Sequence, residues 1–197
     1  GKLISAPYEI VVGPLTLYLA PVATAFPSID TAPSGSWIKV GTSGAKNYDD
    51  GGVAVGRNQT VETFTPAGST APQKAFRTEE ALEIGVTLVD VSPTQYAQAY
   101  NNATVTTVAA STGVPSTKAI PLLQGFEVAT FALLARGKSS VNDALACQYQ
   151  VPICFQSGSP SEVWDKGAPV KLELSFMALE DSSNGFGKLI EQTAVAT

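Results

Sequence analysis

Apolar and polar residues alternate along three stretches of this chain, which is the period of a β-strand with one buried face. In FRTEEALEIGVTLVD, residues 76–90, one set of alternate positions is apolar throughout: Leu82, Ile84, Val86 and Leu88. The segments NQTVETF (58–64) and VKLELSFMALED (170–181) alternate in the same way. We therefore predict three half-buried strands, and the first two, joined by one loop, can pair as a hairpin.

Shorter elements fill the rest of the pattern. Apolar and β-branched runs predict further strands within residues 15–19, 37–40, 103–108, 125–137 and 145–155. Ser92 before Pro93 is a helix start, so one short helix is expected over 92–101. Residues 186–197 can close as a helix or a strand. Many strands, one flanking helix and long loops predict an all-β sandwich or barrel.

The connecting segments divide the chain into an arm and one domain. Residues 1–13 are expected to be an extended N-terminal arm, and residues 14–197 a single β domain. Residues 21–36 and the Gly- and Asp-rich segment 41–52 are predicted to be loops without regular structure. The first apolar stretch imitates a secretory signal, but Glu9 and Pro14 interrupt it. We expect a soluble protein that is made in the cytoplasm and has no membrane segment.

Composition and net charge limit which classes of function the protein can have. The chain has 17 Gly and 13 Pro among 197 residues, 44% hydrophobic residues and only 15% charged ones, so its polar surface is easily buried against neighbours. The net charge of −5 has the wrong sign for a protein that grips phosphates tightly. An acidic protein can still meet DNA productively if DNA has to slide past it without sticking.

Candidate chemistry is sparse, and we expect no enzyme, no cofactor and no metal. The chain contains no histidine, which removes the commonest general base and His-ligated zinc. Gly51 and Gly56 have the spacing of a phosphate-binding loop, but Arg57 and Asn58 replace the residues that reach phosphate and Mg²⁺. The acidic pairs Asp49, Asp50 and Glu79, Glu80 are predicted to be solvated charges.

The two cysteines and two tryptophans are interpreted as structural. Cys147 and Cys154 are seven residues apart, which points them to opposite faces of a strand, so a local disulfide is not expected. Two small buried thiols suit a reducing compartment. Trp37 and Trp164 lie in strand-like apolar patterns and are predicted to be buried in the core.

Glu62 and Glu83 lie in the middle of the two strands expected to form the hairpin, on their less apolar faces. If the hairpin forms, the two carboxylates make an acidic stripe on one face of a sheet whose other face is core. The plainer interpretation is that they are two ordinary exposed glutamates.

Several stretches together resemble the major tail proteins of siphophages: GPLTLYLAPV, SWIKVGTSG, and YDDGGVAVGRNQTVETFTPAGSTAPQKAFRTEEALEIGVTLVD with the helix SPTQYAQAYN. A second cluster, EVWDKGAPVKLELSFMALED, resembles the closing strands of the same proteins. Their order and spacing carry the resemblance, which covers more than half of the chain.

The resemblance implies a structural virion protein with a β-sandwich or barrel fold. In that family six copies form a ring, and rings stack into a tail tube through which DNA and the tape measure protein pass. It implies a homo-oligomer that also contacts other tail proteins and is assembled in the host bacterial cytoplasm. It also implies that Glu62 and Glu83 lie on the lining of the channel.

Alternatives stay open at this stage. Related tubes occur in contractile tails, gene transfer agents and type VI secretion. A surface β-sandwich that binds carbohydrate or a receptor would need an exposed aromatic platform. A polysaccharide-cleaving enzyme would need paired carboxylates that the sequence does not place.

Overall fold

The computed structural model describes residues 10–196 and confirms the all-β class. The predicted N-terminal arm, residues 1–13, therefore falls mostly outside the described residues. The main strands are β1 (Thr16–Pro21), β2 (Ile38–Lys39), β3 (Tyr48–Phe64), β4 (Lys74–Leu88), β7 (Thr130–Lys138), β8 (Ala146–Gln156), β9 (Leu172–Ala178) and β10 (Lys188–Glu191). A small separate pair is formed by β5 (Thr106–Val108) and β6 (Thr117–Ala119).

Among the described residues, the eight main strands form one antiparallel sheet. Seven of them follow the order β2-β1-β7-β8-β9-β4-β3, and the eighth, β10, pairs with β8 outside this order. β8 is long enough to pair with two strands in addition to β7: its first half pairs with β10 and its last residues pair with β9. The predicted strand 125–137 begins only at Thr130, and the C-terminal segment closes as a strand, β10.

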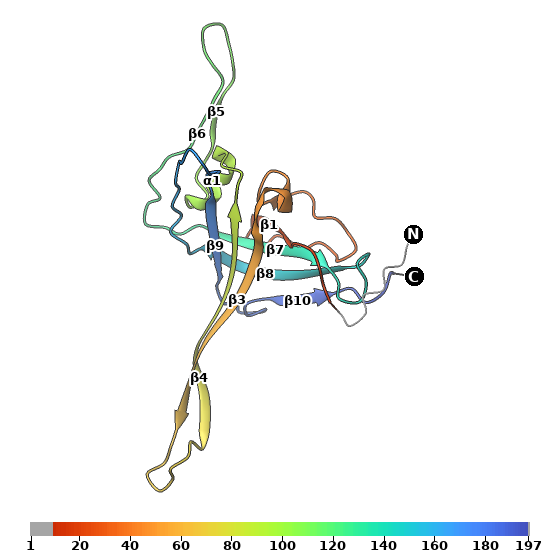
Figure 1. Cartoon of the computed structure of the whole chain (residues 1–197), viewed down its shortest axis with the longest axis vertical. Coiled ribbons are helices and arrows are strands. Elements are labelled where there is room, and N and C mark those ends of the chain that lie inside the picture. Colours follow the sequence, from red (N-terminus) through yellow and green to blue (C-terminus); the bar gives the residue numbers. More distant parts are fainter. Residues whose placement is uncertain (1–9, 197) are drawn as a thin grey trace.

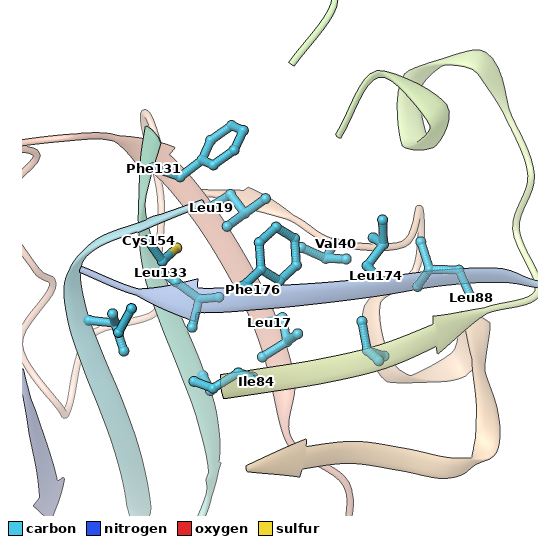
Figure 2. Close-up of a cluster of buried hydrophobic side chains, with 14 of the residues drawn as sticks. Leu17, Leu19, Val40, Ile84, Leu88, Phe131, Leu133, Cys154, Leu174 and Phe176 are labelled. Atoms are coloured by element: carbon cyan, nitrogen blue, oxygen red, sulfur yellow. The ribbon is translucent and has the colours of Figure 1, made fainter. Parts of the chain in front are cut away.

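The sheet curls around the larger of two hydrophobic cores, so that β1 and β7 face β4 and β9 across it. Leu17 of β1, Leu133 of β7 and Ile84 of β4 are all fully or almost fully buried in the same cluster. Phe176 of β9 lies at the centre of these side chains, as Figure 2 shows, and meets Phe131 edge to face at a ring-centroid distance of 6.4 Å. The alternation seen in the sequence is thus the alternation between core and outer face.

The helix α1 (Pro93–Ala99) closes one end of this core. Its position agrees with the prediction from Ser92 and Pro93, although the Ser92 side chain makes no capping hydrogen bond. Ala99 and the partly buried Tyr96 and Tyr100 pack against the core cluster. Gln95 Oε1 accepts a hydrogen bond from the backbone N–H of Gly41, which ties the helix to the loop after β2.

The predicted loop 41–52 is wrong in its second half. A 3₁₀ helix, η2 (Gly44–Asn47), is followed directly by β3, which starts at Tyr48 and runs through the Asp and Gly residues. The Tyr48 ring is buried, and its hydroxyl donates to Val40 O at 2.9 Å and accepts from Leu17 N–H at 3.0 Å. These two bonds hold the start of β3 against β1, which is why a regular strand begins in so polar a segment.

A second, smaller core lies on the outer face of β1 and β7. Trp37 packs there on Ala132 and Leu134, and it stacks at a tilt on Phe26 from the loop 22–36. Arg136 fixes this loop, because its guanidinium donates to the carbonyls of Ser28 and Thr31. The buried Gln148 amide bridges Arg136 and the carbonyl of Pro27.

Two hairpins project from opposite ends of the molecule along its longest axis (Figure 1). The β3–β4 hairpin extends from one end as a long two-stranded ribbon. The shorter β5–β6 hairpin extends from the other end, beside α1. Between them lies the body with the two cores.

Candidate functional site

The part of β3 and β4 that projects from the body, residues 56–80, is called the arm from here on. It is a different segment from the predicted N-terminal arm, residues 1–13. Every strand residue in the arm, Gly56–Phe64 and Lys74–Glu80, is exposed, whereas the next β4 residues alternate between half-buried and buried. Because β3 is the last strand of the sheet, its outer edge is unpaired within the described residues. A two-stranded ribbon of this kind is only marginally stable in water, and a free strand edge is a template for another chain.

The register of the hairpin determines which arm residues share a face. Glu83 lies opposite Gly56, and Glu79 lies opposite Thr60. Glu62 is on the same face as Gly56 and Thr60 because residues at even spacing along a strand point the same way. A β-bulge adds Thr78 to β4 beyond Glu79 without interrupting the alternation of β3.

The neighbouring strand extends this face, which is turned away from the core. Glu173 of β9 lies opposite Thr87 of β4, so it joins the same side. The face therefore carries four glutamates and, at the far end of the arm, one cation, Lys74. We call it the acidic face after its glutamates: Glu62, Glu79, Glu83 and Glu173. At its body end Lys171 is paired with Asp49 at 2.8 Å, and this hydrogen bond lowers the pKa of the Asp49 carboxyl.

The two glutamates singled out from the sequence have different surroundings. Glu83 is half-buried at the root of the arm, where its Oε1 accepts hydrogen bonds from the hydroxyls of Ser175 (2.5 Å) and Ser157 (3.3 Å). Glu62 is exposed on the arm itself, opposite Phe76. The hairpin thus places both on one face but separates them along it. Glu79 and Glu173 were missed, because only the register reveals that they belong to this face.

The far end of the arm is apolar. Phe64, which lies opposite Lys74 on the face of Glu62, is 58% exposed, and Phe76 is 44% exposed. Val61 on the opposite face is also exposed. About half of each of these large apolar side chains is left open to water on a projecting ribbon, as is common at surfaces that bind another molecule.

Six more exposed apolar side chains lie in two segments that are tied to α1 or to Asn101 just after it, and we call them the α1-end patch: Leu122, Leu123, Phe126, Val128, Val163 and Trp164. All six are at least 60% exposed. Asn101, just after α1, anchors the first segment by donating to the carbonyls of Gln124 and Glu127. Tyr96 anchors the second segment by donating to Glu162 at 2.5 Å. Burial and this carboxylate raise the pKa of the Tyr96 hydroxyl.

The prediction for the two tryptophans is half right. Trp37 is buried, and its indole N–H donates to Ala25 O at 3.0 Å. Trp164 is 74% exposed, so its predicted place in the core is wrong. The segment around it, residues 157–171, belongs to no strand, and without a partner strand an apolar pattern does not bury its side chains.

The remaining candidates form no chemical site in the described part of the chain. Gly51 and Gly56 lie within β3, with no helix after them to complete a phosphate-binding loop. Within residues 10–196 no group of three or more metal-ligating side chains comes together. Cys147 and Cys154 are both free, and burial raises the pKa of the Cys154 thiol to about 12. No helix in the same range has the length and hydrophobicity to cross a bilayer.

Comparisons with known proteins find likeness in structure but not in sequence. No family model and no curated protein matches the sequence. A chain from a solved structure described as "Tail of empty GTA particle computed with helical refinement, C6 symmetry" superimposes with a TM-score of 0.41. The two chains are 11% identical, and the match covers 90% of this chain and 95% of that one. A TM-score at this level does not by itself establish a shared fold.

Proposed function

We propose that this protein is a structural virion protein, the subunit of a phage tail tube. Copies of the chain close into rings, and stacked rings enclose a channel for DNA and the tape measure protein. A ring of six follows from the resemblance to siphophage major tail proteins. The tube is assembled in the host cytoplasm, carries other tail proteins at its ends and needs neither cofactor nor metal.

The arm is the observation that carries this proposal. Its strand residues are exposed on both faces, and the outer edge of β3 is free. Neighbouring copies supply the missing strand partners when the edges of identical chains meet around a closed ring. The arms then form a continuous β-lining, and the bodies form the outer wall.

The acidic face gives that lining a function. DNA driven along a channel must not bind the wall, because each Lys or Arg that contacts a phosphate adds affinity through counterion release. Such affinity would be multiplied over every ring. With Glu62 and Glu83 turned toward the channel, together with Glu79 and Glu173, the wall repels the phosphates and DNA passes without being held.

Purified protein tests the proposal directly. We expect closed rings and tubes in negative-stain micrographs, and a discrete oligomer by light scattering. A matched variant lacks most of the arm: residues 59–80 are replaced by Asn-Gly, which joins the paired residues Asn58 and Ala81 by a tight turn. This variant removes only exposed strand and loop, so it should stay folded by circular dichroism and remain monomeric. A wild-type chain that is monomeric at high concentration would refute the proposal.

The exposed indole of Trp164 favours one alternative, a surface β-sandwich that binds carbohydrate. Its N–H is 3.3 Å from Glu162 Oε2, so an aromatic face and a carboxylate lie side by side as in a sugar site. Titration of Trp fluorescence with a panel of oligosaccharides separates the two functions. The tail-tube proposal expects no saturable quenching, whereas quenching that disappears in Trp164→Ala favours the alternative.

A further inference from the structure

We infer that a pocket beside Gln150, on the outer face of β8, binds a peptide segment of a partner protein through one apolar side chain and the adjoining peptide group. This inference goes beyond the proposed function and does not depend on it. The pocket lies between β8, the loop after β1 and the loop before β10, and we call it the Gln150 pocket. Its volume is about 350 Å³, near the lower end of the range of roughly 300–1,000 Å³ for small-ligand sites.

Two buried glutamines on β8 differ in whether their side chains are paired. Gln148 and Gln150 are two residues apart, so both side chains point to the outer face of the strand. The Gln148 amide is engaged by Arg136 and by the carbonyl of Pro27. Gln150 is only 7% exposed, and its amide makes no hydrogen bond to any residue within 10–196. Its backbone pairs with β7 on one side and β10 on the other, so the side-chain amide alone is left over.

A buried amide without a partner needs an explanation. Buried polar groups are almost always hydrogen-bonded, because a group that loses water and gains no partner destabilises the fold. The Gln150 side chain borders the pocket, so a ligand there can supply the missing partner. Its amide offers both donors and an acceptor, which match the C=O and the N–H of a peptide group.

The walls of the pocket fit a medium-sized apolar side chain. Val22 and Phe26 come from the loop after β1, and Pro152 and Ile153 come from β8. Phe26 is held in place by stacking on Trp37 at a ring-centroid distance of 5.2 Å. A wall that is already fixed loses little freedom when a ligand binds, which favours affinity.

One wall also carries backbone strain. Ala23 has a φ of 69°, in the left-handed region that a non-glycine residue rarely adopts. The N–H and the hydroxyl of Thr24 both donate to the carbonyl of Pro21, at 3.2 and 2.7 Å, and hold this turn. Strained residues that the surrounding bonds hold in place are concentrated at sites that clamp a ligand.

The rim of the pocket does not select a charged ligand. It carries one carboxylate, Asp181, and one ammonium, Lys188, whose charges offset each other. Asp181 is also occupied by its own loop, since it accepts hydrogen bonds from the backbone and side-chain N–H groups of Asn184. The apolar walls and the Gln150 amide therefore determine what binds.

Tryptophan fluorescence tests the inference on the full chain. Trp164→Phe leaves Trp37, which contacts the pocket residue Phe26, as the single tryptophan. The probe is N-acetyl-leucinamide, which carries an isobutyl group and two amides. We expect a saturable change in fluorescence with a Kd of about 1–10 mM, as is usual for so small a ligand. N-acetylglycinamide lacks the side chain and 3-methylbutanol lacks the amides, so each should bind at least about 10-fold more weakly.

Two variants identify the group that recognises the amide. Gln150→Met keeps the length of the side chain, and it should weaken N-acetyl-leucinamide about 10-fold but leave 3-methylbutanol unchanged. Gln150→Glu, which loses only the N–H donors, replaces it if the Met variant does not fold. Ile153→Ala should weaken both probes. Gln124→Met, at an exposed glutamine outside the pocket, is the matched control and should change neither.

A longer ligand tests whether the occupant is a peptide. The capped tripeptide Ac-Ala-Leu-Ala-NH2 should bind at least as tightly as N-acetyl-leucinamide, whereas weaker binding would show that the pocket takes a free small amide and no peptide. The inference would also be overturned by fluorescence that does not saturate up to about 50 mM, by equal affinity for all three small probes, or by an affinity that Gln150→Met leaves unchanged. None of these outcomes bears on rings or tubes, so the tail-tube proposal stands or falls separately.

Discussion

Removing the hydroxyl of Tyr48 should loosen the root of the arm. Tyr48 is the first residue of β3, and its hydroxyl links that strand to Val40 O and Leu17 N–H. Tyr48→Phe keeps the ring and its packing but leaves both backbone groups without this partner. Leu17 and Val40 are fully buried, so water cannot replace the hydroxyl.

The expected loss follows from those two bonds. Each hydrogen bond contributes about 1 kcal/mol, and a buried polar group left unpaired costs about 1–3 kcal/mol. The free energy of unfolding should therefore fall by about 2–4 kcal/mol, which lowers the melting temperature by roughly 5–15 °C for a chain of this size. Urea unfolding of the monomeric, arm-deleted protein measures it without interference from assembly.

The same hydroxyl makes the effect depend on pH. Burial raises the pKa of Tyr48 from its ordinary 10.0 to about 12. Because the folded pKa lies above the unfolded one, the stabilisation is complete below pH 10 and is lost as the pH rises from 10 to 12. The slope is about 1.4 kcal/mol per pH unit. The difference between wild type and Tyr48→Phe should therefore shrink over this window. Ionisation of Cys154 affects both proteins equally and cancels in the difference.

Tyr18→Phe is the matched control. Tyr18 follows Leu17 in β1, and its hydroxyl makes no hydrogen bond to any described residue. It should change the stability by less than about 0.5 kcal/mol. A loss below 1 kcal/mol in Tyr48→Phe, or a difference that does not change between pH 10 and 12, would show that the hydroxyl does not hold β3 as described.

The remaining predictions concern the lining, the body and the second core. Glu62→Lys with Glu79→Lys should leave tube assembly intact but make the tubes retain duplex DNA at about 50 mM salt. The DNA should be released as the salt concentration rises, as expected for counterion release, and release that does not depend on salt would count against a channel lining. Gly187→Ala should destabilise the subunit by more than about 3 kcal/mol, because the added Cβ would lie 1.9 Å from Gln150 O and the φ of Gly187 is +103°. Gly167→Ala is the control: a Cβ there would meet open space, so the melting temperature should not change. Arg136→Met should cost about 1–3 kcal/mol and free the loop 22–36 for limited proteolysis, since the carbonyls of that loop lose their donor.

The sequence was sufficient to predict the strands in which apolar and polar residues alternate. The alternation from Leu82 to Leu88 is the buried face of β4, and the alternation around Phe176 is that of β9. The helix followed from Ser92 and Pro93. These predictions depend on side chains close together in the chain, whose period directly reflects which face is buried.

Features that depend on pairing could not be predicted in the same way. The acidic face combines Glu62, Glu83 and Glu173 from three strands, and the sequence does not contain their register. Trp164 looked like a core residue because its neighbours are apolar, but burial requires an element that packs on it. Tyr48 could not be predicted as a strand residue, because the Asp and Gly residues after it favour a loop. Its hydroxyl bonds to Leu17 and Val40 explain why a strand begins there.

The difference between the two ends of the molecule has a consequence for anything built from it. A filament of chains that all point the same way has a direction, and its first and last layers present different chemistry to their surroundings. One terminus would display the arm ends with Phe64 and Phe76, and the other the β5–β6 hairpin and the surface around α1 (Figure 1). No single protein could therefore cap both termini by the same contact. A filament of this kind would require two unlike terminators, and a soluble mimic of one end surface would block growth at one terminus only.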